Sequence, residues 1–218
     1  MAGSVTDAAS APDADGAAGV DGRMARRARN RDAVVDALLA LYEEGDLRPG
    51  ADAVAERAGL SQRSVFRYFE DVDDLCRAAV ERQQERVAGL LTVAAAPSAS
   101  LRTRIEAVVE QRLALFEAIG AVGVVARLRA PFQPELAAQL DRGRRSLRAQ
   151  LRRAFAPEFE ALGPERAAAA LAATDVLCSF EAHQLLRRDQ GLGRARIGAV
   201  LTASLSALLR AEHPPEDR

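Results

Sequence analysis

The sequence predicts an all-α protein, and three observations lead to this fold class. Apolar residues recur three or four positions apart in each long segment from residue 30 onwards, which is the period of an amphipathic helix. No segment shows the strict alternation of apolar and polar residues that a half-buried strand shows. Proline and glycine break up the periodic segments, at Gly45, Gly59, Pro97, Pro131, Pro134, Pro157, Pro164 and Gly191 to Gly193.

The first 22 residues differ from the rest in composition. They are rich in alanine, glycine and aspartate and lack hydrophobic periodicity, so we expect a disordered tail, or an extension upstream of a start at Met24. They carry four aspartates and no basic residue; without them the formal net charge of −1 becomes +3. Residues 23–31 then hold five arginines and no acid, which places the basic charge just before the first helix.

A helix over residues 30–45 precedes a two-helix motif within residues 52–75. The apolar stripe of the first motif helix consists of Val54, Ala55 and Ala58. Gly59 supplies the positive φ that often ends a helix, at the centre of a three-residue turn, and Leu60 is free to pack over that turn. Ser61 is placed to cap the amides of a second, short helix.

The second motif helix is expected to have one apolar and one polar face. Its apolar residues recur at helical spacing and are Val65, Phe66 and Phe69. The side chains left to point outward are those of Gln62, Arg63, Ser64 and Arg67. A helix, a tight turn and a short polar-faced helix form the arrangement that places a helix in the major groove of DNA.

Further helices follow the motif. A long helix begins near Asp71, with Asp73 and Asp74 in its first turn, and runs to about Val93. The remaining helices are expected at residues 100–120, 121–130, 134–156, 164–188 and 194–212. The arginines at 142, 144, 145, 148, 152 and 153 are interpreted as a solvated helix face rather than a second nucleic-acid patch.

The text VAERAGLSQRSVFRYFEDVDDL resembles the signature of the TetR family of transcriptional regulators, "IAxxAGVSxxTLYxYFxxKxxL". The positions that agree are Val54, Ala55, Ala58, Gly59, Leu60, Ser61, Ser64, Val65, Tyr68, Phe69 and Leu75. The stretch SFEAHQLLR in the penultimate helix is also similar to text of that family. Two positions depart from the pattern: Phe66 stands where the family has a tyrosine, and Val72 where it has a lysine, both phosphate contacts.

The resemblance implies an N-terminal three-helix helix-turn-helix DNA-binding domain and a larger C-terminal helical ligand-binding and dimerisation domain. We place the disordered tail at 1–22, the DNA-binding domain at 23–75, the effector-binding and dimerisation domain at 76–212, and a second tail at 213–218.

Arg63 is suited to a bidentate contact with guanine and Gln62 to a contact with adenine, while Arg67, Tyr68 and the arginine-rich segment suit phosphates. The alternative is that Arg63 or Arg67 pairs with a surface carboxylate such as that of Glu70. The candidate DNA-binding residues are Ser61, Gln62, Arg63, Ser64, Arg67, Tyr68, Arg26, Arg27 and Arg29.

Residues 197–209 contain no charged residue, so their helix cannot comfortably expose half its circumference to water. The helix over 164–188 has two apolar arcs, one for the body of the protein and one for a partner; they are Leu171, Ala182 and Leu185, and Val176, Leu177 and Phe180. These two helices predict a homodimer through a four-helix contact, and a larger monomeric core is the alternative.

A ligand chamber is expected where Arg112 interrupts the apolar face of residues 105–119. The candidate ligand-binding residues are Arg112, Phe116, Thr174, Asp175, Cys178 and Glu181. In this interpretation Arg112 engages an anionic or carbonyl-bearing effector. In the alternative it forms a buried pair with Asp175 or Glu181 that fixes helix packing.

Composition argues against enzymes, cofactors, metals and membranes. All 30 basic residues are arginine, which removes the P-loop lysine and Schiff-base chemistry, and two histidines assemble no convincing catalytic set. The two cysteines lie far apart, so neither a disulfide framework nor a metal cluster is expected. No apolar segment approaches the roughly 20 residues that cross a bilayer, and we expect a cytoplasmic protein.

Together these features predict a DNA-binding transcriptional regulator, specifically a repressor that a small-molecule effector releases from a palindromic operator in double-stranded DNA. The alternative is a helical carrier or sensor of lipophilic small molecules without sequence-specific DNA binding. The effector, the operator and the choice between repression and activation are not encoded in these patterns.

Overall fold

The computed structural model describes residues 14–96 and 98–210, and over these ranges the chain is helical with no strand, which confirms the all-α class. The helices are α1 Ala14–Glu43, α2 Ala51–Arg57, α3 Gln62–Tyr68, α4 Val72–Val87, α5 Leu101–Arg129, α6 Pro134–Ala154, α7 Ala156–Leu162, α8 Pro164–Leu177, α9 Phe180–Gln184 and α10 Arg194–Leu208. Short 3-10 segments, Ala88–Leu91 (η1) and Ala130–Phe132 (η2), and a π-helical segment, Leu185–Asp189 (η3), complete the fold. None of the helices described is long and apolar enough to cross a membrane.

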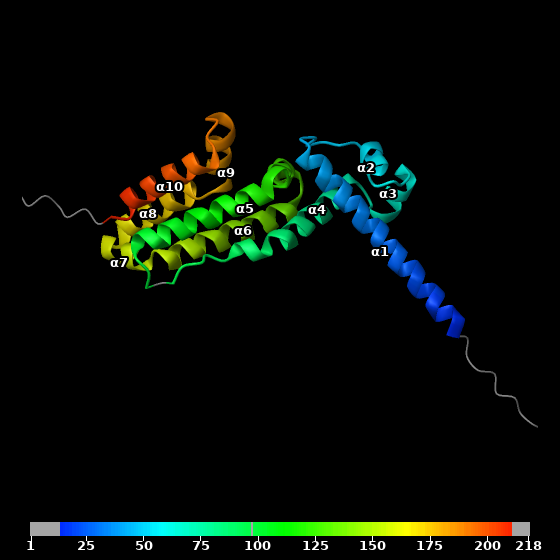
Figure 1. The fold of residues 1–218 in the computed structure, drawn as a ribbon, viewed down its shortest axis with the longest axis horizontal. Helices are drawn as coiled ribbons and strands as arrows, with labels where there is room; N and C mark the ends of the chain where they lie inside the picture. Colours follow the sequence, from blue (N-terminus) through cyan, green and yellow to red (C-terminus); the bar gives the residue numbers. More distant parts are fainter. Residues whose placement is uncertain (1–13, 97, 211–218) are drawn as a thin grey trace, which may run out of the picture.

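The molecule is elongated, with α1 to α3 at one end and α7 to α10 at the other, and α4 runs from the first end to lie against α5 (Figure 1). The N-terminal end has an apolar core in which α1, α2, α3 and α4 meet through residues such as Leu38, Val54, Val65 and Leu75. A second core joins α5, α6, α7, α8 and α10 at the other end. The expected boundary at residue 75 falls inside α4, so that division of the chain remains a prediction.

Helix α1 is longer than the sequence predicted. It begins at Ala14, so residues 14–22, expected in a disordered tail, are helical; residues 1–13 lie outside the described residues, as does the second tail at 213–218. No proline interrupts α1 and alanine is frequent in it, so the helix that Val34 and Leu38 anchor in the core continues back through the arginine-rich segment.

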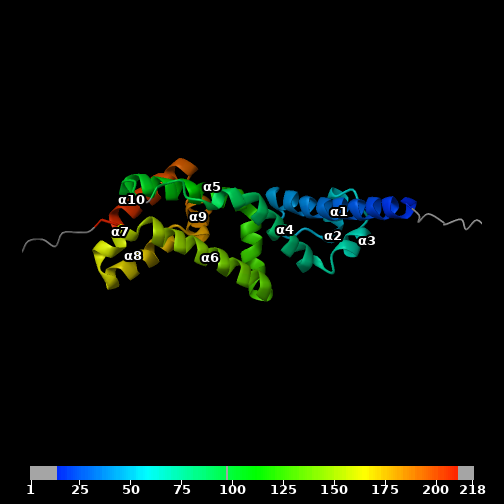
Figure 2. The same ribbon diagram turned by 90° about the horizontal axis from the view of Figure 1, so that it is seen from below.

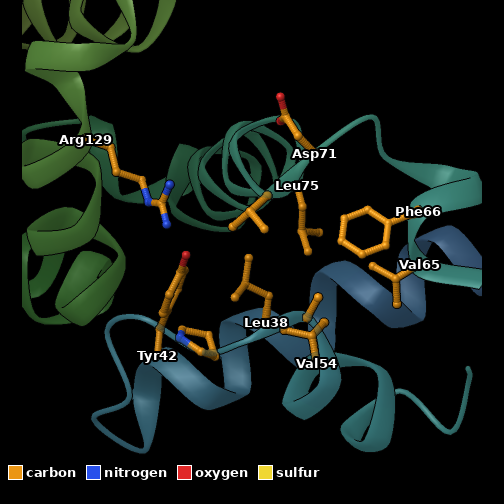
Figure 3. A pocket seen from close by; sticks show the side chains of 11 residues that line it. Leu38, Tyr42, Val54, Val65, Phe66, Asp71, Leu75 and Arg129 are labelled. Carbon is orange, nitrogen blue, oxygen red and sulfur yellow. The ribbon is translucent and has the colours of Figure 1, made fainter. Parts of the chain in front are cut away.

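The turn between α2 and α3 agrees with the sequence. Gly59 has φ +65°, and the hydroxyl of Ser61 accepts a hydrogen bond from the Ser64 amide at 3.2 Å. Val65 and Phe69 are buried, but Phe66, expected on the same apolar face, is 47% exposed. A helix of seven residues buries only a narrow stripe, and Phe66 lies at the edge of that stripe. Phe66 and Leu75 both line a small crevice there (Figure 3).

The two helices expected at 100–120 and 121–130 form the single helix α5, which bends at Gly120 with φ 49° and ψ −132°. Only glycine adopts such angles without strain. Figure 2 shows the second limb turned sharply away from the first. That limb delivers Val122, Val125 and Ala126 to the N-terminal core, where they pack against α1 and α4.

The helix expected at 164–188 is broken. The hydroxyl of Ser179 accepts from the Ala182 amide at 3.1 Å and so starts the new helix α9. The break rotates the two apolar arcs: Leu171 and Phe180 are buried, whereas Val176 and Leu185 are 66% and 55% exposed. Helix α7 was not predicted: the sequence analysis took Pro157 as a break between helices, whereas this proline lies in the first turn of α7.

Gly59→Ala is expected to lower the free energy of unfolding by about 1 kcal/mol, because an L-residue is strained at positive φ. An added Cβ meets no atom within 4 Å at this position, so the cost comes from the backbone alone. The matched control is Gly143→Ala inside α6, which also meets no atom within 4 Å and should gain up to about 1 kcal/mol from helix propensity. Urea unfolding of the two variants measures both, and equal effects would contradict the backbone explanation.

Candidate nucleic-acid interface and internal cavity

The polar face of α3 is presented to solvent on a capped helix. Ser61, Gln62, Arg63 and Arg67 are exposed, and Ser64 is half-buried. The Ser61 and Ser64 hydroxyls lie 2.9 Å apart and add to the cap. Within the described ranges Arg63 forms no ion pair or hydrogen bond, so the pairing with Glu70 that was the alternative for it is not seen. Its guanidinium group is therefore available to a partner.

Tyr68 joins the end of α3 to α1. Its hydroxyl accepts hydrogen bonds from the Asn30 amide at 3.1 Å and from Arg67 Nη2 at 2.9 Å, and these donors lower the pKa of Tyr68. The Arg67 guanidinium also lies 5.1 Å from the centre of the Tyr68 ring. Arg67 is thus held against α3 by a tyrosine rather than by the carboxylate of Glu70.

The arginine-rich segment is a helical extension. Arg26, Arg27 and Arg29 are exposed on the N-terminal half of α1, which runs on past α3 into solvent (Figure 1). The Arg31 guanidinium lies 4.9 Å from the centre of the Phe69 ring, at the point where this half joins the three-helix core. The basic segment therefore projects from the same end of the molecule as α3.

Ion pairs hold α1 against α4 beneath this face. Arg82 Nη2 lies 2.5 Å from Asp32 Oδ1, and Arg82 Nη1 lies 3.2 Å from Asp36 Oδ1. Arg86 Nη2 approaches the same Asp36 oxygen at 2.7 Å. Each partly exposed pair contributes up to about 1 kcal/mol, and the shared carboxylate makes them a network that fixes the register of the two helices.

A cavity of about 400 Å³ lies between α4, α5 and α6. Of the six predicted ligand-binding residues, only Phe116 lines it. The lining residues are Val80, Gln83, Gln84, Val87, Leu91, Leu115, Phe116, Ile119, Val122, Gly123, Ala126, Arg127, Gln139, Leu140, Arg142, Gly143, Arg144, Ser146 and Leu147. The α6 arginines, which the sequence analysis assigned to a solvated face, therefore lie partly at this cavity.

Arg112 is fully buried but does not line the cavity. It donates to Gln150 Oε1 at 3.0 Å and to the Leu147 carbonyl at 2.9 Å, while its Nε has no partner among the residues that the structure describes. Burial lowers the pKa of Arg112. The expected alternative, a pair with Asp175 or Glu181, is not seen among the described contacts; Arg112 instead ties α5 to α6 through neutral acceptors.

The other predicted ligand-binding residues lie apart from the cavity. Thr174 and Cys178 are buried where α8 meets the core, and burial raises the pKa of the Cys178 thiol to about 12. Asp175 lies 3.7 Å from Arg148. Glu181 is at the surface; although burial alone would raise its pKa, hydrogen bonds from Arg127 and Arg144 lower the pKa to about 2. The sequence placed these residues on one arc because it treated α8 and α9 as one continuous helix.

No protein-family model matches this sequence, and no curated protein matches it either. Solved structures do resemble it. A TetR-family transcriptional regulator from Streptomyces coelicolor aligns with TM-score 0.65 and 18% identity over 83% of this chain and 80% of its own. A transcriptional regulator from Rhodococcus sp. Rha1 aligns with TM-score 0.61 and 19% identity over 84% of this chain and 95% of its own. The chain therefore has the fold of TetR-family regulators, as the helix-turn-helix signature implied.

Arg112→Ala is expected to lower the free energy of unfolding by roughly 2 kcal/mol, because it leaves a cavity and removes the donors to Gln150 and Leu147. Arg152→Ala on the exposed side of α6 should change it by less than about 0.5 kcal/mol. Chemical denaturation measures both. If Arg112→Ala were as stable as the parent or more stable, the desolvation cost of the buried cation would equal or exceed the stabilisation from its hydrogen bonds and packing.

His183 should make stability depend on pH. Both ring nitrogens are buried and have no hydrogen-bond partner in the described part of the chain, and burial lowers the pKa of His183 below its ordinary value of 6.5. The unfolded chain then binds the proton more readily, so the free energy of unfolding should fall as pH drops below about 6.5 and be unaffected by this group above it. Denaturation at pH 7.5 and 5.5 tests this, since His183→Leu should lose less stability than the parent over that interval. Equal losses would exclude the histidine as the cause.

Proposed function

We propose that the protein is a ligand-responsive transcriptional regulator that binds double-stranded DNA through α3. The observation that carries the proposal is the exposed row Gln62 and Arg63 at the capped start of a helix that Val65 and Phe69 anchor in the core. In helix-turn-helix proteins the amino-terminal side chains of this helix reach base edges in the major groove. The fold shared with TetR-family regulators supports the same assignment.

We propose distinct roles for the residues of this face. Arg63, which has no described partner, contacts a base edge, and Gln62 lies beside it. Ser61 and Ser64 cap the start of the helix, where it approaches the DNA backbone. Arg67 and Tyr68 position the helix on phosphates, because their side chains are fixed to each other and to α1. Basic side chains farther along α1 add sequence-independent affinity for the flanking phosphates: Arg26, Arg27 and Arg29.

A homodimer would present two such helices to a palindromic operator. We propose that it forms through α8 and α10, which pack side by side. Their exposed faces carry small and apolar residues, including Ala172 and Val176 of α8 and Ala199, Ala203 and Ala207 of α10. Small side chains let helices approach closely, and two copies of this pair would bury a face that a monomer leaves in water.

The cavity is the proposed effector site. Its walls include Val80, Val122 and Ala126, which belong at the same time to the core beneath the DNA-binding helices. A ligand that favours one spacing of these walls would shift the orientation of α3 in the dimer, and we propose that the shift releases a repressor from its operator. Arg112 would then act on the effector only indirectly, through Leu147 of the cavity wall.

A second candidate function rests on the same cavity. A helical carrier or sensor of lipophilic molecules would need only the apolar walls and would leave the exposed α3 face without a role. The two candidates differ in their affinity for duplex DNA, which should fall steeply with salt for a regulator. Selection of duplexes from a random pool at physiological salt tests this and yields the half-site spacing; recovery of no sequence preference would favour the carrier.

Arg63→Ala is expected to relax the sequence preference at one operator position at a cost of about 1 to 3 kcal/mol, because a bidentate base contact is lost. Arg67→Ala is the control: it should weaken binding to all sequences alike and reduce the salt dependence. Binding to systematically mutated operators distinguishes the two patterns. Uniform weakening by Arg63→Ala would refute its role in base recognition.

A further inference from the structure

We infer that the cavity between α4, α5 and α6 takes an amphipathic organic anion, with its apolar body inside and its acidic group at the α6 side of the opening. This inference names the ligand class of the proposed effector site and rests on that function, although the binding itself requires no DNA.

The walls of the cavity suit a long apolar body. They are built mostly from aliphatic and aromatic side chains of three helices and one 3-10 segment: Val80, Val87, Leu91, Leu115, Phe116, Ile119, Val122, Ala126, Leu140 and Leu147. A volume of about 400 Å³ falls in the range of sites for small organic molecules. Transfer of an apolar chain from water to such walls is favourable in proportion to the area it buries.

The charges at the cavity are all of one sign. Arg127, Arg142 and Arg144 line it, and none of the lining residues is acidic. Glu181 accepts hydrogen bonds from Arg127 at 2.8 Å and Arg144 at 2.6 Å, so one carboxylate serves two guanidinium groups. Arg142 forms no ion pair or hydrogen bond within the part of the chain that the structure describes. An excess of positive charge remains beside an apolar space, which complements a carboxylate on an apolar body.

A buried polar side chain independently points to an occupant. Gln83 lines the cavity and is 8% exposed; its Nε2 donates to the Ala118 carbonyl at 2.6 Å, whereas its Oε1 has no hydrogen-bond partner among residues 14–96 and 98–210. A buried acceptor without a donor costs free energy. A hydroxyl or amide group on a bound molecule would supply the missing hydrogen bond and recover that cost.

The test uses the full chain and three probes that share one hydrocarbon tail: dodecanoate and dodecylammonium, each below its micelle-forming concentration, and dodecanol, below its solubility limit. Isothermal titration calorimetry should give one site per chain, with dodecanoate bound about fivefold or more tighter than dodecanol and dodecylammonium weakest. Arg142→Gln should reduce the affinity for dodecanoate about fivefold, as expected for a partly exposed ion pair, and leave that for dodecanol unchanged. Arg145→Gln is the matched control, because Arg145 lies on the same helix, pairs with Asp141 and does not line the cavity.

Similar affinities for the three probes, no binding of any of them, or equal effects of Arg142→Gln and Arg145→Gln would overturn the inference. A parallel selection of duplexes from a random pool keeps this result separate from the proposed function. Charge-selective binding by a protein that ignores DNA would uphold the ligand class and reject the regulator, while DNA binding without charge selectivity would do the reverse.

Discussion

Helix α5 is the element on which the rest of the structure depends. Its first limb supplies Ile105 and Val108 to the C-terminal core, its middle supplies Phe116 to the cavity, and its second limb supplies Val125 to the N-terminal core. Because α5 is buried on several sides, it does not show a single apolar stripe. The bend at Gly120 directs its two limbs toward different cores. One helix therefore contributes side chains to the cores at both ends of the molecule.

Electrostatic contacts add orientation to this apolar frame. Arg129, at the end of the second limb of α5, lines the crevice beside α3 (Figure 3). It also pairs with Asp73 in the first turn of α4. Arg104 near the start of α5 is buried, and its Nη2 lies 2.5 Å from Oε1 of the half-buried Glu158 of α7. The two guanidinium groups lie at opposite ends of α5. Because a guanidinium group is planar and has several donors, it fixes the orientation of a helix better than an ammonium group would.

Short-range signals made the helix-turn-helix predictable, whereas the cavity depends on long-range packing. The positive φ of Gly59 and the cap at Ser61 are decided by neighbours in sequence, and both agree with the structure. The break at Ser179 was missed because a serine inside an apolar period reads equally well as helix interior or cap. The position of the cavity depends on which faces of α4, α5 and α6 pack together, and the apolar period of a single helix does not determine this packing.

The two thiols have a practical consequence. Cys76 is buried in the N-terminal core beside the Tyr42 hydroxyl at 3.1 Å, Cys178 is buried in the C-terminal core, and burial raises the pKa of both. Neither is a good nucleophile while its surroundings stay closed, since the thiolate is the reactive form. The rate of alkylation of each thiol therefore measures how often the core around it opens, and no engineered label is needed.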